Sequence, residues 1–203
     1  MNIRNFPTLK MENAIRISLD KILKGLFKEL QPGKVLEIGA TYSPHKDLVP
    51  HTEYKTLDIA RDSYADIISD VKDIQWQGDY FDTVICTEVL EHVNSPQTAI
   101  NEIHRVLKPC GICILSTRFI QSYHPSPLDF YRFTMDSLRQ LFCEFETIEI
   151  FPQGNRIQLI WTMIFGGKLA IIGNILNPLI GRINWQDNLW PCGYVVRAKK
   201  TLK

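Results

Sequence analysis

The 203-residue sequence has no surplus of charge of either sign. Lys and Arg together number 23 and Asp and Glu number 22, so the formal net charge is +1. A nucleic-acid-binding domain usually carries a basic patch and a strongly basic composition. We therefore expect no nucleic-acid partner.

We expect neither a targeting segment nor a disulfide framework. Its first residues, MNIRNFPTLKMENAIR, mix charges without a continuous apolar core, which is typical of neither a secretory signal nor a membrane anchor. The five cysteines are scattered, and the pair Cys110 and Cys113 has no second pair or His cluster beside it. These absences predict a cytoplasmic protein with no disulfides and no metal site.

Glycine is scarce where nucleotide-binding loops need it. The stretch GATYSPH contains only Gly39, so the GxGxxG pattern that cradles a dinucleotide pyrophosphate is missing. We also find no phosphate loop and no Ser, His and Asp arrangement of the kind that a hydrolase requires. The sequence therefore gives no support for a nicotinamide enzyme, a nucleotide hydrolase or a serine hydrolase.

What the sequence does have is apolar strand patterns alternating with helical ones. Alternation of this kind predicts an α/β fold, a Rossmann-like doubly wound, mostly parallel sheet in a three-layer αβα arrangement. The spacing predicts strands at 34–39, 53–57, 66–69, 82–87, 111–117, 145–151 and 193–199, and helices at 11–30, 94–107 and 134–142.

Acidic and small residues stand where the predicted strands end. KVLEIG ends in Glu37 and Gly39 and is followed by the turn-and-helix signal Ser43 and Pro44, which indicates the first strand of a βαβ unit. The next strand ends in Asp58, and a carboxylate there can accept both hydroxyl protons of a ribose. Parallel strands bind ligands beyond their carboxyl ends, so this edge of the sheet predicts a nucleoside site.

With these residues, and with LEHV after the fourth strand, the sequence resembles the class I S-adenosylmethionine-dependent methyltransferases, in their small-molecule branch. The resemblance covers roughly residues 30 to 117. It implies an antiparallel last strand and S-adenosyl-L-methionine as cofactor. The cofactor-binding positions that it implies are Glu37 at the amino group, Gly39 and Ala40 at the turn, Asp58 with Ile59 at the ribose, Asp70 with Val71 at the adenine, and Thr87 at the methionine part.

Methyl transfer from a sulfonium is an in-line displacement in which positioning does much of the catalysis. An oxygen acceptor also needs a general base, and His suits neutral pH. We identify His92, in LEHV, and His124, in the segment 118–133, as candidate catalytic residues. A helix-start hydrogen bond is an equally good explanation of His92, and the loop 118–133 could serve only as a rigid connection.

An apolar insertion, 152–191, precedes the last strand. Its segment 157–183 is compatible with contact to a membrane surface, with a homodimer contact or with packing inside the molecule. Lys168 interrupts the segment, so no stretch reaches the roughly 20 apolar residues that a membrane span needs. We expect a single methyltransferase domain over 1–203 that includes the helix 11–30 and this insertion.

The sequence thus predicts an S-adenosylmethionine-dependent methyltransferase that acts on a small-molecule or lipid-linked acceptor, with a saccharide hydroxyl among the candidates and O-methylation as the reaction. The competing hypothesis is a methyltransferase-like binding or scaffold protein without turnover. The glycine-poor loop favours the second hypothesis, whereas Asp58, Asp70 and LEHV favour the first.

Overall fold

A computed structural model describes residues 14–40, 45–124, 128–165, 170–183, 185 and 187–202. Seven strands form one sheet in the order β3-β2-β1-β4-β5-β7-β6. The strands are β1 (Gly33–Ile38), β2 (His51–Asp58), β3 (Ile67–Ile68), β4 (Phe81–Thr87), β5 (Leu107–Arg118), β6 (Thr147–Gln153) and β7 (Gly193–Lys199). The α-helices are α1 (Ala14–Phe27), α2 (Pro96–Val106), α3 (Met135–Leu141), α4 (Arg156–Phe165) and α5 (Ala170–Ile180).

The direction of the strands confirms the predicted fold class. Each neighbouring pair from β3 to β5 is parallel, whereas β7 is antiparallel to both β5 and β6. Because β6 therefore runs in the same direction as β1 and β4, its carboxyl end lies at the same edge of the sheet as theirs. The last strand is the antiparallel one, as the resemblance implied.

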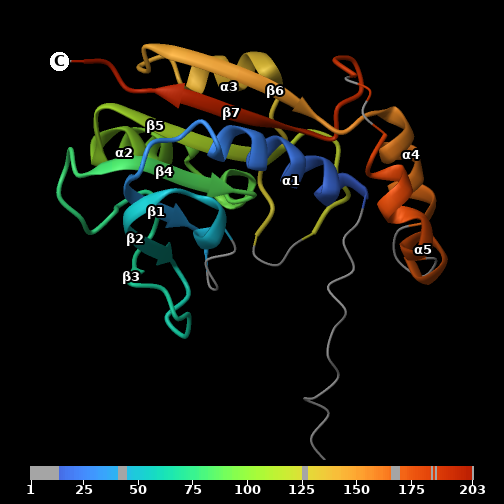
Figure 1. Cartoon of the computed structure of the whole chain (residues 1–203), viewed down its shortest axis with the longest axis horizontal. Coiled ribbons are helices and arrows are strands. Elements are labelled where there is room, and N and C mark those ends of the chain that lie inside the picture. Colours follow the sequence, from blue (N-terminus) through green and yellow to red (C-terminus); the bar gives the residue numbers. More distant parts are fainter. Residues whose placement is uncertain are drawn as a thin grey trace, which may run out of the picture.

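Helices cover both faces of the sheet (Figure 1). On one face, α1 places Leu19, Leu23 and Phe27 against Val35 and Ile85 of the central strands. The other face carries α2 and α3 over a larger buried cluster, to which α2 contributes Ala99, Ile100, Ile103 and Val106 and α3 contributes Leu138. Alternate residues of β1 and β4 face opposite sides, which is why both sides of these strands are apolar. The core is thus divided into two layers by the sheet.

The connection between β1 and β2 differs from the βαβ unit that the sequence predicted. It contains only a 3₁₀ turn, Lys46–Leu48, among its described residues, and the signal residues Ser43 and Pro44 lie outside them. Twelve residues separate Ile38 from His51, which leaves little room for a helix that must also cross back to the start of the sheet. In this structure α1, which precedes β1, covers that face.

The other differences concern element ends. β5 begins at Leu107 rather than at residue 111, because Leu107 already pairs with Phe81 before the register shifts. The helix from residue 94 begins at Pro96, a residue suited to the first helical turn. The third strand is only two residues long, Ile67–Ile68, and no helix follows it before β4. No helix among the described residues is long and apolar enough to span a membrane.

Candidate active site

A cavity of about 610 Å³ opens at the carboxyl ends of β1, β2, β3 and β4. Apolar side chains supply much of its wall, and charged or polar groups stand at a few points. The residues that line it are Ile38, Gly39, Leu57, Asp58, Ile59, Ala60, Ser69, Asp70, Val71, Lys72, Glu88, Val89, His92, Val93, Asn94, Leu128 and Phe130. A mostly apolar pocket with a few polar groups is the usual form of a small-molecule site.

Gly39 lies where the backbone at the end of β1 comes close to Val89, in the loop after β4. Its φ is +75°, a left-handed conformation that side chains disfavour. A Cβ at this position would lie 2.3 Å from Cγ2 of Val89. The N–H groups of Gly39 and Ala40 both donate to the carbonyl of Leu57, at 2.8 and 3.4 Å. These two N–H groups are therefore already committed to the sheet, and Ala40 does not line the cavity.

The two aspartates at the strand ends both face the cavity. Oδ1 of Asp58 accepts a hydrogen bond from the N–H of Ala60 at 2.9 Å, which fixes the turn after β2. Oδ1 of Asp70 accepts from the N–H of Lys72 at 2.9 Å, and the Lys72 ammonium lies 3.5 Å from the other carboxylate oxygen. Each acid is followed by an apolar residue that also lines the cavity, Ile59 after Asp58 and Val71 after Asp70.

Glu37 has a different environment from the one expected of a cofactor contact. Its side chain is 1% exposed and does not line the cavity. One carboxylate oxygen lies 2.6 Å from Nδ1 of His45, and the other accepts from the hydroxyl of Tyr54 at 2.7 Å. Burial and the adjacent carboxylate raise the pKa of Tyr54 well above its usual value. Thr87 does not line the cavity either, and it pairs with Ser116 of β5 in the sheet.

Glu88 lines the cavity, although the sequence reasoning passed over it. Its φ of 58° is rare for a residue with a side chain. The carboxylate accepts from the hydroxyl of Ser116 at 2.7 Å and pairs with the guanidinium of Arg118. Such strain is retained where the surroundings fix it, often at functional sites. Its place directly after Thr87 at the end of β4 is the signal that could have identified it.

His92 lies at the cavity wall with a defined orientation. Its Nδ1 is 2.8 Å from the carbonyl oxygen of Leu128. Because a carbonyl only accepts, Nδ1 must carry a proton, and in the neutral ring Nε2 then holds a lone pair. A ring arranged in this way can accept a proton from a substrate hydroxyl.

His124 does not line the cavity but packs against the ring of His92. The two ring centroids are 4.9 Å apart in an edge-to-face arrangement. Nδ1 of His124 lies 3.3 Å from Oδ2 of Asp129. The same oxygen accepts a hydrogen bond from the backbone N–H of His124 at 3.1 Å. Arg132 donates to both carboxylate oxygens of Asp129 at 2.5 and 2.6 Å, and this lowers the pKa of Asp129 well below its usual value.

The three side chains His92, His124 and Asp129 could in principle surround a metal ion. The two hydrogen bonds from Arg132 already neutralise Asp129, and the Leu128 carbonyl occupies one nitrogen of His92. A cation would have to compete with a guanidinium at its carboxylate ligand. The geometry therefore fits the pairing of Asp129 with Arg132 and His124 better than it fits a metal centre.

Residues 128–133 are held against the 3₁₀ turn Leu90–His92, which follows β4. The N–H groups of Phe130 and Tyr131 both donate to the carbonyl of Glu91, at 2.9 and 3.2 Å. The Tyr131 hydroxyl donates to the carbonyl of Asn94 at 3.2 Å. Leu128 and Phe130 thereby form part of the cavity wall. Pro125 and Pro127, the two prolines of the segment 118–133, lie outside the described residues.

Comparisons with known proteins agree with this geometry. A family model described as "Methyltransferase domain" matches residues 49–115. Ubiquinone biosynthesis O-methyltransferases of Psychrobacter cryohalolentis and Psychrobacter arcticus are each 46% identical to the chain over 37 residues, which are 18% of this chain and 14% of the relative.

Solved structures share the fold at low sequence identity. Phosphoethanolamine N-methyltransferase 2 of Haemonchus contortus, solved with S-adenosyl-L-methionine, has a TM-score of 0.61 at 14% identity, covering 89% of this chain and 51% of that one. A possible histamine N-methyltransferase of Thermotoga maritima has a TM-score of 0.61 at 15% identity, covering 93% and 92%. The chain thus spans only about half the length of the Haemonchus enzyme. Residues 49–115 thus match a methyltransferase domain model, and the chain shares the fold of solved S-adenosylmethionine-dependent methyltransferases.

Proposed function

We propose that the protein transfers a methyl group from S-adenosyl-L-methionine to a hydroxyl oxygen of a small-molecule or lipid-linked acceptor. The observation that carries this proposal is the cavity of about 610 Å³, which brings Gly39, Asp58, Asp70 and His92 together at one edge of the sheet.

The residues present fit the cofactor. Gly39 lines the cavity without a side chain and lets Val89 pack close to its backbone, Asp58 offers a carboxylate for the ribose hydroxyls, and Asp70 with Val71 offers a polar edge beside an apolar surface for the adenine. When bound, the cofactor would supply an electrophilic methyl group. The N–H groups of Gly39 and Ala40 bond Leu57, so holding the amino acid part requires other donors of the chain.

His92 is the side chain best placed to remove a proton from the acceptor hydroxyl. Its Nδ1 proton is held by the Leu128 carbonyl, which leaves Nε2 to accept. The ring of His124, which packs edge to face on His92 and is paired with Asp129, would hold the His92 ring in position for this step. Leu128 and Phe130 would exclude water from the site, which strengthens electrostatic interactions within it.

Oxygen as the acceptor atom rests on this base, because a free amine reacts through its own lone pair and needs no proton removed in advance. The 37-residue similarity to ubiquinone biosynthesis O-methyltransferases supports the same choice. A methyltransferase-like protein that binds but does not turn over remains the competing hypothesis, since the loop after Gly39 is poor in glycine.

Two measurements distinguish these hypotheses. Titration calorimetry with S-adenosyl-L-methionine and its demethylated product tests binding, and release of demethylated product with hydroxyl-bearing acceptors, including lipid-linked saccharides and phenols, tests turnover. We expect both binding and turnover. Binding without turnover across the acceptor panel would favour the scaffold hypothesis, and failure to bind either ligand would contradict both.

A further inference from the structure

The helices α4 and α5 form a hairpin beside α1, at one end of the sheet (Figure 1). Trp161 of α4 donates to the side chain of Asn177 in α5 at 2.9 Å, and Gln158 donates to the carbonyl of Ile180 at 3.1 Å. The hairpin is held closely against α1, since a Cβ on Gly181 would lie 2.8 Å from Cβ of Ile17. The side chains of Trp161, Gln158 and Asn177 thus form hydrogen bonds between α4 and α5.

The outer face of the hairpin is apolar and exposed. Met163 is 73% exposed and Ile175 is 79% exposed. We call this face the apolar surface, and its described members are Ile157, Ile160, Met163, Ile164, Ile175, Leu176 and Leu179. In α4 the members recur at helical spacing, as expected of one face of a helix. An exposed apolar area of this kind on a monomer marks an interaction site.

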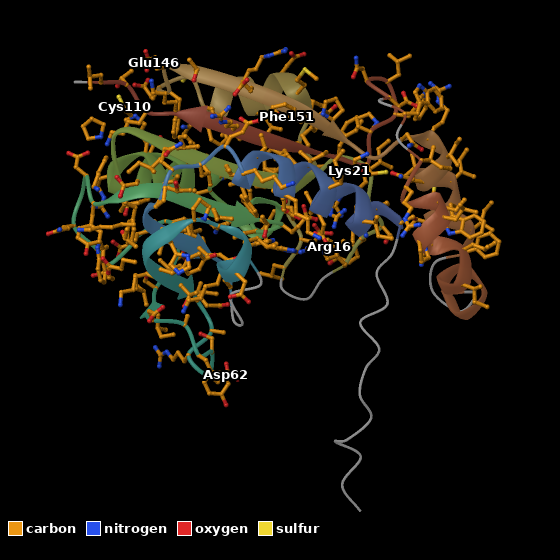
Figure 2. All side chains as sticks on the ribbon, in the orientation of Figure 1. Arg16, Lys21, Asp62, Cys110, Glu146 and Phe151 are labelled. Carbon is orange, nitrogen blue, oxygen red and sulfur yellow. The ribbon has the colours of Figure 1, made fainter. Side chains whose placement is uncertain are left out.

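Charge is arranged around the apolar surface rather than on it. α5 contains no charged residue, and in α4 the only one is Arg156 at its first position. The acid of this region, Asp187, is 3% exposed and is neutralised by Arg156 at 2.7 Å. Arg182 follows α5 as an exposed residue, and Lys21 is exposed on the adjacent α1 (Figure 2). Asp20 of α1 is paired with Arg16 at 2.9 Å, so among the residues that the structure describes the exposed charges at this border that make no ion pair are basic ones.

Tryptophan lies at the same border. Trp185 and Trp190 are 46% and 51% exposed in the segment that returns from α5 to β7. Indole rings favour the boundary between hydrocarbon and water, and basic residues favour anionic headgroups. A second protein copy would require a partner face of matching shape, and a two-fold interface would bring two sets of basic border residues into one contact region. An apolar centre bordered by basic and indole groups matches a lipid surface better.

We propose that the α4–α5 hairpin docks this protein onto the surface of an anionic lipid bilayer, with the apolar surface inserted at the level of the headgroups and Arg182 and Lys21 at the phosphates. The hairpin does not cross the bilayer, in keeping with the absence of a spanning helix among the described residues. α4 follows β6, whose carboxyl end lies at the cavity edge of the sheet. Docking would therefore hold the cavity near the membrane, where a lipid-linked acceptor resides.

Sedimentation with vesicles tests the proposal on the full chain, without donor or acceptor. We expect binding to phosphatidylglycerol vesicles and weaker binding to pure phosphatidylcholine vesicles. The double variant Met163→Asp and Ile175→Asp should lose at least about tenfold in binding, because two side chains can no longer enter the lipid. Arg182→Ala should weaken binding to the anionic vesicles about fivefold.

The matched control is the double variant Tyr64→Asp and Leu202→Asp, which adds the same two negative charges at residues that are 84% and 78% exposed outside the hairpin. It should bind vesicles like the unmodified protein, and circular dichroism should show all variants folded. Absence of vesicle binding by the unmodified protein, or full binding by the double variant, would overturn the proposal. Light scattering that shows a dimer split by the double variant, with no vesicle binding, would assign the surface to a second copy instead. Because the assay contains no donor, its outcome is independent of methyl transfer.

Discussion

The carboxylate of Glu37 and the ring of His45 lie 2.6 Å apart, and both side chains are almost fully buried. Tyr54 completes this group by donating to the second oxygen of Glu37. Loss of the carboxylate would leave two buried polar groups without a partner. We expect Glu37→Ala to lower the free energy of unfolding in urea by roughly 2 to 4 kcal/mol. Glu37→Gln, which keeps an acceptor, should cost less.

The same variants test the role that family resemblance gave to Glu37. Because Glu37 does not line the cavity, Glu37→Gln should change the affinity for S-adenosyl-L-methionine less than removal of Asp58 does. Calorimetry at a temperature where both proteins are folded makes the comparison. A larger loss of affinity for Glu37→Gln would return this residue to the binding site.

Asp58→Ala should weaken S-adenosyl-L-methionine binding by about tenfold to a hundredfold, the scale of a lost charge-assisted hydrogen bond. The control is Asp62→Ala, which removes the same charge at the tip of the β2–β3 connection (Figure 2), outside the cavity wall. Its affinity in titration calorimetry should match that of the unmodified protein. Equal affinities for the two variants would argue against ribose binding by Asp58.

Gly39→Ala places a Cβ 2.3 Å from Val89 and requires a disfavoured φ. We expect a loss of roughly 1 to 3 kcal/mol in the free energy of unfolding, together with weaker donor binding as Val89 is pushed into the cavity. Gly25→Ala in α1 meets nothing within 4 Å. This control should raise stability by about 0.5 to 1 kcal/mol and leave donor binding as it is.

His92→Asn keeps a donor for the Leu128 carbonyl and removes the Nε2 lone pair. If His92 is the base, the rate of product release should fall about a hundredfold or more, while the affinity for the donor changes little. His124→Asn, behind it, should reduce the rate less. A His92→Asn protein with full turnover would show that the hydrogen bond to Leu128 is the whole role of this residue.

Glu91 provides a pH test of the buried region beneath the segment 118–133. Burial, and then the charge of Glu88, raises the pKa of Glu91 from 4.5 to about 7. Between these values the unfolded chain releases the proton while the folded protein keeps it, so stability falls as the pH rises. The total loss attributable to this group is about 3 kcal/mol, and it is complete above pH 7.

Glu91→Gln removes this titration. The variant should therefore gain stability relative to the unmodified protein as the pH rises from 4.5 to 7, in urea unfolding at a series of pH values. Glu102 is the contrasting control, because hydrogen bonds from Arg105 lower its pKa. Glu102→Gln should lose a contribution that is present above pH 4.5 and disappears in acid. Parallel pH profiles for the unmodified protein and Glu91→Gln would contradict the assignment.

Much of the sheet could be predicted from the sequence because its strands are short apolar runs bounded by turn signals. Gly193–Lys199 has the predicted bounds, and β4 differs by one residue. The prediction of a helix after β1 was wrong. Turn signals do not show whether a connection is long enough to hold a helix and also return to the start of the next strand. The pairing of Glu37 with His45 was also beyond the sequence, since it depends on a loop folding back beneath the sheet.

The position of β7 also bears on the order in which the sheet assembles. In the described sheet β6 pairs only with β7, yet β7 is made after the whole α4–α5 hairpin. During synthesis on the ribosome β6 therefore has no place in the sheet while the apolar surface is already emerging. The fold closes only when β7 enters between β5 and β6, so the apolar surface of the hairpin is made before the sheet is complete and is open to chaperones or a nearby bilayer at that stage.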